Sequence, residues 1–232
     1  MRRLGGHPAT ALGLDLDDET DLGRWLAAAC LLAARSGEPV ALAAFRALRA
    51  AHLTAPAELA RASPEQIASA LAQASYPKPE VAARRLWRAA GSLLAGYRGS
   101  PAALARQAEC AEELAARVAA LAPGIGAATA AAFLRPLRDA FPAAREIPLS
   151  PAARAAALHL GLLRAGEDEE GEPGALRAAL GSGTPLADAE AALERLGRRA
   201  CLRERADRCP LGDACPARAR LARERAVGLP VD

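Results

Sequence analysis

The chain has 232 residues, is 52% hydrophobic but only 3% aromatic, and carries a formal net charge of +3 at pH 7. Ala, Leu and Arg dominate the composition, which favours helices over strands. The small positive charge is only a weak indication of an acidic partner. No apolar run is long enough to span a membrane and no cleavable signal pattern opens the sequence, so we expect a cytoplasmic protein with no membrane partner.

Start and stop signals predict an all-α protein. Ser63-Pro64-Glu65-Gln66 resembles a capping box, and a Ser-Pro pair also begins segments at Ser100 and Ser150. Glycines at positions 96, 161 and 197 are predicted helix stops. The predicted helices are 22–35, 39–51, 56–61, 64–73, 79–95, 101–120, 127–139, 151–163, 185–199 and 216–226. Residues 1–20 are predicted to be a loose lead-in, and 164–185 an acidic linker with a short helix at 175–180.

The most specific local pattern is Leu121-Ala122-Pro123-Gly124-Ile125-Gly126-Ala127-Ala128-Thr129-Ala130. Glycines on both sides of Ile125 allow a tight turn between two helices and a close approach of the backbone to a partner. Their N–H groups, together with the free N–H groups of the next helix, form an anion site suited to a DNA phosphate. An ordinary helix–turn–helix connection with glycine caps remains the alternative.

Three of the five cysteines gather near the end of the sequence, as Cys201-x7-Cys209-x5-Cys215. Cys30 and Cys110 lie in apolar or Ala-rich segments and are predicted to be small packed helix residues. From Arg195 onward the sequence has ten arginines and five acidic residues. A solvated helix face explains part of this excess, and its sign asymmetry favours a phosphate-facing surface.

The turn around Gly124 resembles the hairpin of the endonuclease III (HhH-GPD) superfamily of base-excision DNA glycosylases. The similarity extends in order through the helix at 25–35, the loop Tyr76-Pro77-Lys78-Pro79, the segment 147–151 with Leu160-Gly161-Leu162, and Gly197–Cys201. It implies two helical lobes with DNA between them: 16–144, carrying the helix–hairpin–helix, and 145–232 together with 1–15. Family members flip a nucleotide out of the duplex to reach its glycosidic bond.

The resemblance also implies the residues that would act, and here the chain departs from the family. The catalytic carboxylate is replaced by Ser150, whose structural role would be to cap a helix. The lysine of the bifunctional members is replaced by Ala128, and Lys78 is the only lysine. Asp139 and Glu146 are the fallback carboxylates.

The same resemblance implies a DNA-contacting set: Arg35, Lys78, Pro123, Gly124, Ile125, Gly126, Ala127 and Thr129. Arg35 matches the side chain that fills the gap left by a flipped base, although an arginine at a helix C-terminus can equally interact with the helix dipole.

The three clustered cysteines resemble a four-cysteine iron–sulfur loop that lacks its second ligand. They could hold a [4Fe–4S] cluster with a carboxylate such as Asp207 or Asp213 as the fourth ligand, bind zinc, or be reduced thiols without metal.

Together these observations predict a monomeric DNA-binding protein of base-excision repair or lesion recognition, with double-stranded DNA, damaged or abasic, as its partner. Glycosylase and lyase activity are expected to be weak or absent. The alternatives are a non-enzymatic DNA clamp and a helical protein-interaction module.

Overall fold

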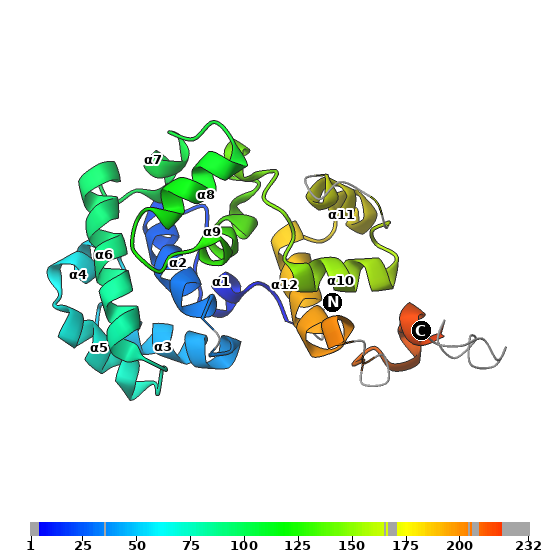
Figure 1. Cartoon of the computed structure of the whole chain (residues 1–232), viewed down its shortest axis with the longest axis horizontal. Coiled ribbons are helices and arrows are strands. Elements are labelled where there is room, and N and C mark those ends of the chain that lie inside the picture. Colours follow the sequence, from blue (N-terminus) through cyan, green and yellow to red (C-terminus); the bar gives the residue numbers. More distant parts are fainter. Residues whose placement is uncertain are drawn as a thin grey trace. The chain divides into compact units, whose positions relative to one another are not determined.

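The computed structural model describes residues 5–34, 36–164, 166, 171–203, 205 and 209–219, and these residues form helices and connecting turns without a strand. The all-α prediction is confirmed. The chain divides into two compact units. We call Pro8–Ile147 the hairpin unit, and Met1–His7 with Pro148–Asp232 the cysteine unit (Figure 1).

The hairpin unit contains the first nine α-helices. They are α1 (Pro8–Ala11), α2 (Glu19–Leu32), α3 (Glu38–Ala50), α4 (Pro56–Arg61), α5 (Pro64–Gln73), α6 (Pro79–Tyr97), α7 (Pro101–Ala105), α8 (Ala111–Ala119) and α9 (Ala127–Leu134). The capping box at Ser63 is confirmed, since Ser63 Oγ accepts from the Gln66 amide and Gln66 Oε1 accepts from the Ser63 amide.

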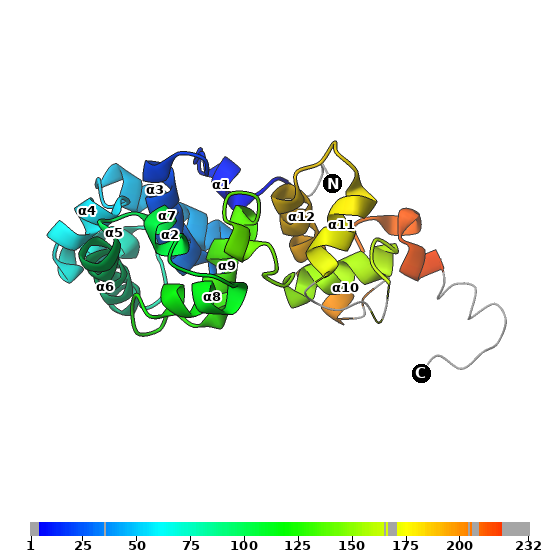
Figure 2. The same ribbon diagram turned by 90° about the horizontal axis from the view of Figure 1, so that it is seen from above.

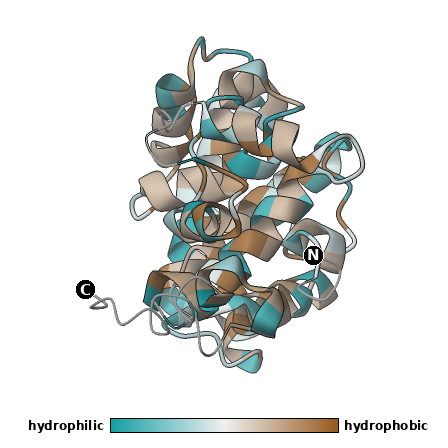
Figure 3. Ribbon diagram, turned by 90° about the vertical axis from the view of Figure 1, so that its right-hand side faces the viewer, coloured by the Kyte–Doolittle hydropathy of each residue, from teal (hydrophilic) through white to brown (hydrophobic). Residues whose placement is uncertain are grey.

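The core of this unit is built around α2, whose side chains are buried along most of its length. Trp25, Phe45 and Phe133 are its largest fully buried side chains. Trp25 Nε1 donates a 3.0 Å hydrogen bond to the carbonyl oxygen of Phe133 and so ties α9 to α2. Hydrophobic and hydrophilic residues alternate along the ribbons, as expected of amphipathic helices (Figure 3).

The cysteine unit contains α10 (Pro151–Leu160), α11 (Glu172–Leu180) and α12 (Leu186–Arg199). Helices α10 and α12 pack closely over one another (Figure 2). Gly197 makes this possible, because a Cβ added there would lie 1.8 Å from the carbonyl oxygen of Ala152. The sequence prediction that Gly197 ends a helix was wrong, since it lies inside α12 as a contact residue.

The N-terminal residues are shared between the units, which differs from the expected assignment of 1–15 to the second lobe. Residues 5–7 contact α12, where the His7 amide donates to Asp188 Oδ1 at 2.6 Å and Arg195 donates to the Gly5 carbonyl. From Pro8 onward the chain belongs to the hairpin unit, because Ala9, Leu12 and Leu14 are buried in that core. The other division falls between residues 147 and 148 rather than 144 and 145.

Two long predicted helices are shorter in the structure. The segment 101–120 is broken between α7 and α8, and Cys110 is an exposed residue at the start of α8 rather than a packed helix residue. Pro136 ends the segment predicted as 127–139, which continues only as the 3-10 turn Arg135–Leu137. Gly96 lies inside α6, whereas Gly161 ends α10 with φ 71° as predicted.

Among the described residues, no helix combines the length and apolar character needed to cross a bilayer.

Candidate nucleic-acid interface

The turn between α8 and α9 has buried anchors and an exposed tip. Leu121, Ala122 and Ile125 are buried in the core of the hairpin unit. Gly124 has φ 88°, a conformation that favours glycine. Helices α8 and α9 contact one another on either side of the turn (Figure 1).

Beyond the turn, α9 begins with amides that have no backbone partner in the described part of the chain. The Gly126 carbonyl accepts from the amides of Thr129 and Ala130, at 2.9 and 3.0 Å. The amides of Gly126, Ala127 and Ala128 donate to no backbone carbonyl in the described part of the chain, and all three residues are exposed. Such amides at a helix N-terminus suit an anion.

Of the other predicted contact residues in the hairpin, Pro123 is exposed, whereas Ile125 and Thr129 are buried at 5% and 6% relative exposure. The two buried residues support the turn from inside. The geometry therefore leaves the backbone of 123–128 as the surface open to a ligand.

A basic side chain that sequence analysis missed lies beside this turn. The Nε and Nη2 atoms of Arg85, on α6, are 3.0 and 3.1 Å from the position that a Cβ would take at residue 124. No local pattern links Arg85 to Gly124.

The end of α2 and the loop before α6 are joined by a hydrogen bond. Tyr76 Oη donates a 2.9 Å hydrogen bond to the Leu31 carbonyl. Burial raises the pKa of Tyr76, while the hydroxyl of Ser36 and the positive charge of Arg85 oppose that change. Lys78 is exposed and begins α6 with φ 52°. Arg35, the predicted gap-filling residue, lies outside the described residues.

The two residues that the sequence analysis matched to catalytic positions, Ala128 and Ser150, carry no charge and differ in exposure. Ala128 is exposed on the first turn of α9, where it offers a methyl group and an amide. Ser150 belongs to the cysteine unit, is only 4% exposed, and its Oγ accepts from the Ala153 amide at 3.1 Å. Ser150 therefore caps α10, as its sequence position predicts.

A carboxylate does approach Ser150, but from α12. Glu190 Oε1 accepts from the Ser150 amide at 3.2 Å, and Glu190 is 3% exposed. It is thus engaged within the protein rather than presented to a substrate. The fallback carboxylates Asp139 and Glu146 are exposed on the hairpin unit.

The three C-terminal cysteines belong to the buried core of the cysteine unit. Cys201, Cys209 and Cys215 are all buried. Burial, with the neighbouring Cys209 and Cys215, raises the pKa of Cys201 to about 11. Burial also raises the pKa of Cys209, and a hydrogen bond with Cys215 adds to the effect.

These thiols match the donors that iron–sulfur clusters and zinc prefer. Asp213 is 99% exposed at its side chain and lies 3.7 Å from Arg218, while Asp207 is outside the described residues. No group of three or more His, Cys, Asp and Glu in the described ranges is already arranged to hold a metal. Metal binding would require the thiols to lose their protons.

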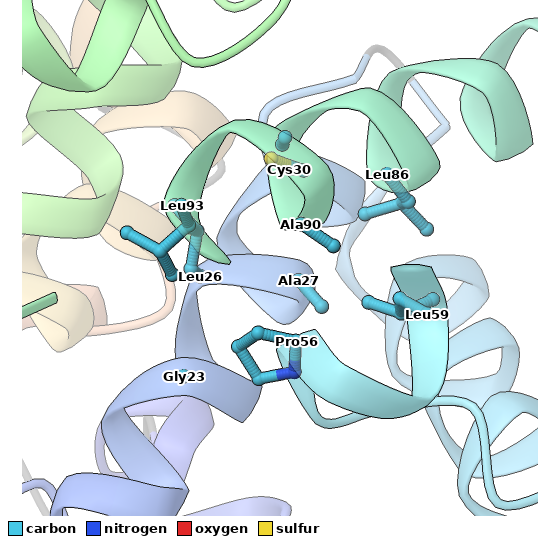
Figure 4. A pocket seen from close by; sticks show the side chains of 10 residues that line it. Gly23, Leu26, Ala27, Cys30, Pro56, Leu59, Leu86, Ala90 and Leu93 are labelled. Carbon is cyan, nitrogen blue, oxygen red and sulfur yellow. The ribbon is translucent and has the colours of Figure 1, made fainter. Parts of the chain in front are cut away.

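The cavity in Figure 4 is not a ligand site. It lies among α2, α4 and α6, is lined by apolar groups such as Leu26, Leu59 and Leu93, and leaves room for about 10 Å³. Cys30 borders it, and complete burial raises the pKa of that thiol to about 12. A wider hollow of about 330 Å³ lies beside α10, with Arg154 and Glu172 paired at 2.6 Å in its wall.

No family model matches the chain, and no curated protein sequence is similar to it. The likeness to the endonuclease III superfamily therefore depends on the residues of this chain alone.

Proposed function

We propose that this protein binds double-stranded DNA through the turn at 123–128 and is a divergent relative of the endonuclease III superfamily. Its role would be base-excision repair or lesion recognition, acting as a monomer, with glycosylase and lyase activity weak or absent. The observation that carries the proposal is the group of exposed, unpaired amides at Gly126, Ala127 and Ala128.

A DNA phosphate is the ligand that fits these amides best. The amides add to the positive end of the α9 dipole, and together they favour an anion that accepts several hydrogen bonds. The absence of large side chains at 126–128 leaves the backbone accessible to a bulky polymer. Contacts of this kind position a duplex without reading its sequence.

Weak catalysis follows from what the catalytic positions contain. Ala128 has no amine to form a Schiff base with an abasic sugar. Ser150 supplies no charge to a cationic sugar, and its hydroxyl is used as a helix cap. These two substitutions remove groups needed for glycosidic-bond cleavage and strand cleavage, but they leave the amides that would bind DNA.

Cys201, Cys209 and Cys215 are the residues that would hold a metal in this proposal, as a [4Fe–4S] cluster or, alternatively, zinc. The group would stabilise the C-terminal loop by cross-linking it. The alternative without metal is a set of buried thiols that pack against the core of the cysteine unit.

The test is binding of Gly126→Val to a DNA duplex that contains an abasic-site analogue. Nothing lies within 4 Å of a Cβ at residue 126, so the variant has room to fold. Its β-branched side chain would stand over the amides, and we expect most of the affinity to be lost. Gly91→Val, in the half-buried part of α6 and equally uncrowded, is the matched control. Full binding by a folded Gly126→Val protein would contradict the proposal.

A helical protein-interaction module is the second candidate function. It is favoured by two large apolar side chains exposed on α6, Val81 at 46% and Trp87 at 39%. Absence of duplex binding by the wild-type protein at low salt would favour this candidate.

A further inference from the structure

Arg85, on α6, has no counter-charge among the residues that the structure describes. In the described part of the chain no carboxylate forms an ion pair with it, and its Nε atom is buried without a hydrogen-bond partner. Its positive charge acts instead on two groups that burial keeps neutral, the thiol of Cys30 and the hydroxyl of Tyr76, and opposes the rise in the pKa of both.

Leaving such a group unsatisfied is costly. A buried donor without a partner destabilises the folded state, and more so when the group is charged. Most buried polar groups in native proteins are paired, so an exception needs an explanation. One explanation is a ligand that supplies the missing negative charge.

The position of Arg85 indicates where that ligand would bind. Its Nε and Nη2 atoms occupy the space that opens because residue 124 has no side chain. Residue 124 must therefore be glycine for two reasons, its φ of 88° and the guanidinium beside it. Two residues further along begin the exposed amides of Gly126, Ala127 and Ala128.

We propose that Arg85 is the charged member of an anion site formed with these amides, and that it neutralises a phosphate of the DNA backbone. This inference rests on the proposed function, because it assigns a further residue to the same site. A guanidinium suits the role, since its planar set of donors matches the oxygens of a phosphate.

The inference predicts opposite effects on stability and on binding. Arg85→Met keeps the aliphatic length but removes the unpaired charge. We expect its free energy of unfolding without DNA to equal or exceed that of the wild type. An arginine with a purely structural role would instead lose stability when replaced.

The experiment measures duplex affinity of wild type, Arg85→Met and Arg85→Lys over a series of salt concentrations, with chemical unfolding of each. We expect Arg85→Met to bind more weakly and its slope of log affinity against log salt to fall by about 0.9, the loss of one phosphate contact. Arg85→Lys should keep the slope and recover part of the affinity. Arg98→Met is the control, because Arg98 ends α6 about 20 Å from Arg85 along the helix.

An unchanged slope in Arg85→Met would overturn the inference, as would a loss of stability with unchanged binding. If the wild type also binds DNA and Gly126→Val does not, either Arg85→Met result would exclude only the role of Arg85, and the proposed function would stand. If the wild type binds no duplex, both fail.

Discussion

Trp25 and Phe133 are 108 residues apart in the sequence, yet the indole N–H of one donates to the backbone carbonyl of the other at 3.0 Å. Because Phe133 is near the end of α9, this hydrogen bond holds the helix that presents the turn.

Trp25→Phe should therefore destabilise the hairpin unit. It leaves the buried Phe133 carbonyl unsatisfied, which costs about 1–3 kcal/mol, and the smaller ring adds a packing defect. Urea unfolding is the measurement. Trp87→Phe is the control, since Trp87 is 39% exposed and should change stability by less than about 0.5 kcal/mol. Equal effects of the two substitutions would show that the hydrogen bond is unimportant.

Gly197→Ala should be among the most damaging single changes in the cysteine unit. The added Cβ would lie 1.8 Å from the Ala152 carbonyl oxygen, so α10 and α12 must separate. We expect a loss above about 3 kcal/mol in thermal or urea unfolding. Gly91→Ala in α6 meets nothing within 4 Å and should instead stabilise by about 0.5–1 kcal/mol. A tolerated Gly197→Ala would mean that the helices do not pack this closely.

Acid should weaken the hairpin unit through Glu58. Partial burial raises the pKa of Glu58, but the amides of Ala55 and Thr54, both donating to Oε2 at 2.9 Å, hold it below its ordinary value overall. A carboxyl whose folded pKa is lowered stabilises the fold above its unfolded pKa, and the contribution is lost as pH falls through the folded pKa. Glu58→Gln should flatten the decline in unfolding free energy below about pH 4. If the unfolding free energy of Glu58→Gln declines with acid as steeply as that of the wild type, other carboxyls cause the decline.

Catalysis should be weak and should respond to a paired substitution. Losing one electrostatic contribution of this kind costs on the order of a hundred- to a thousandfold in rate. Ser150→Asp alone places a second carboxylate beside Glu190, whose Oε1 accepts from the Ser150 amide, and the two charges repel. Ser150→Asp with Glu190→Gln should therefore release more base from damaged duplexes than either single variant or the wild type.

Two results would contradict this account of catalysis. Rapid base release by the wild type that survives Ser150→Ala would move the reaction to Asp139 or Glu146. A borohydride-trapped adduct with an abasic duplex would require an amine, and Lys78 carries the chain's only lysine amine.

The metal prediction depends on Cys209. Protein purified without oxygen should show a broad visible charge-transfer band that Cys209→Ser abolishes. Cys110→Ser is the control, because Cys110 is exposed and belongs to the other unit. Colourless protein with one zinc per chain would favour zinc, and protein with neither metal would favour reduced thiols.

Helix positions were predictable wherever a local signal set them. Ser63, Ser100 and Ser150 all cap helices, because a serine before proline at a helix start acts within one turn of the chain. Gly197 misled the prediction, since the reason for its glycine is the distant Ala152 rather than a helix end.

In the candidate site, too, features set by local sequence were predictable and features set by distant contacts were not. The exposed turn at 123–128 could be predicted, because glycine spacing and a helix start are local properties. The roles of Arg85 and Glu190 could not be predicted, because each depends on a contact with a distant residue. Arg85 lies beside Gly124, 39 positions away, and Glu190 accepts a hydrogen bond from Ser150, 40 positions away. Contacts at that separation depend on how helices pack, which no short pattern encodes.

The position of Lys78 has a practical use in spectroscopy. It is an exposed lysine, the only one in the sequence, and it begins the helix that carries Arg85. The N-terminal amine would be blocked first. An amine-reactive fluorophore would then attach only at Lys78, about 10 Å along the helix from Arg85. The native sequence thus already contains an attachment point for a dye whose emission could report the arrival of DNA at the turn.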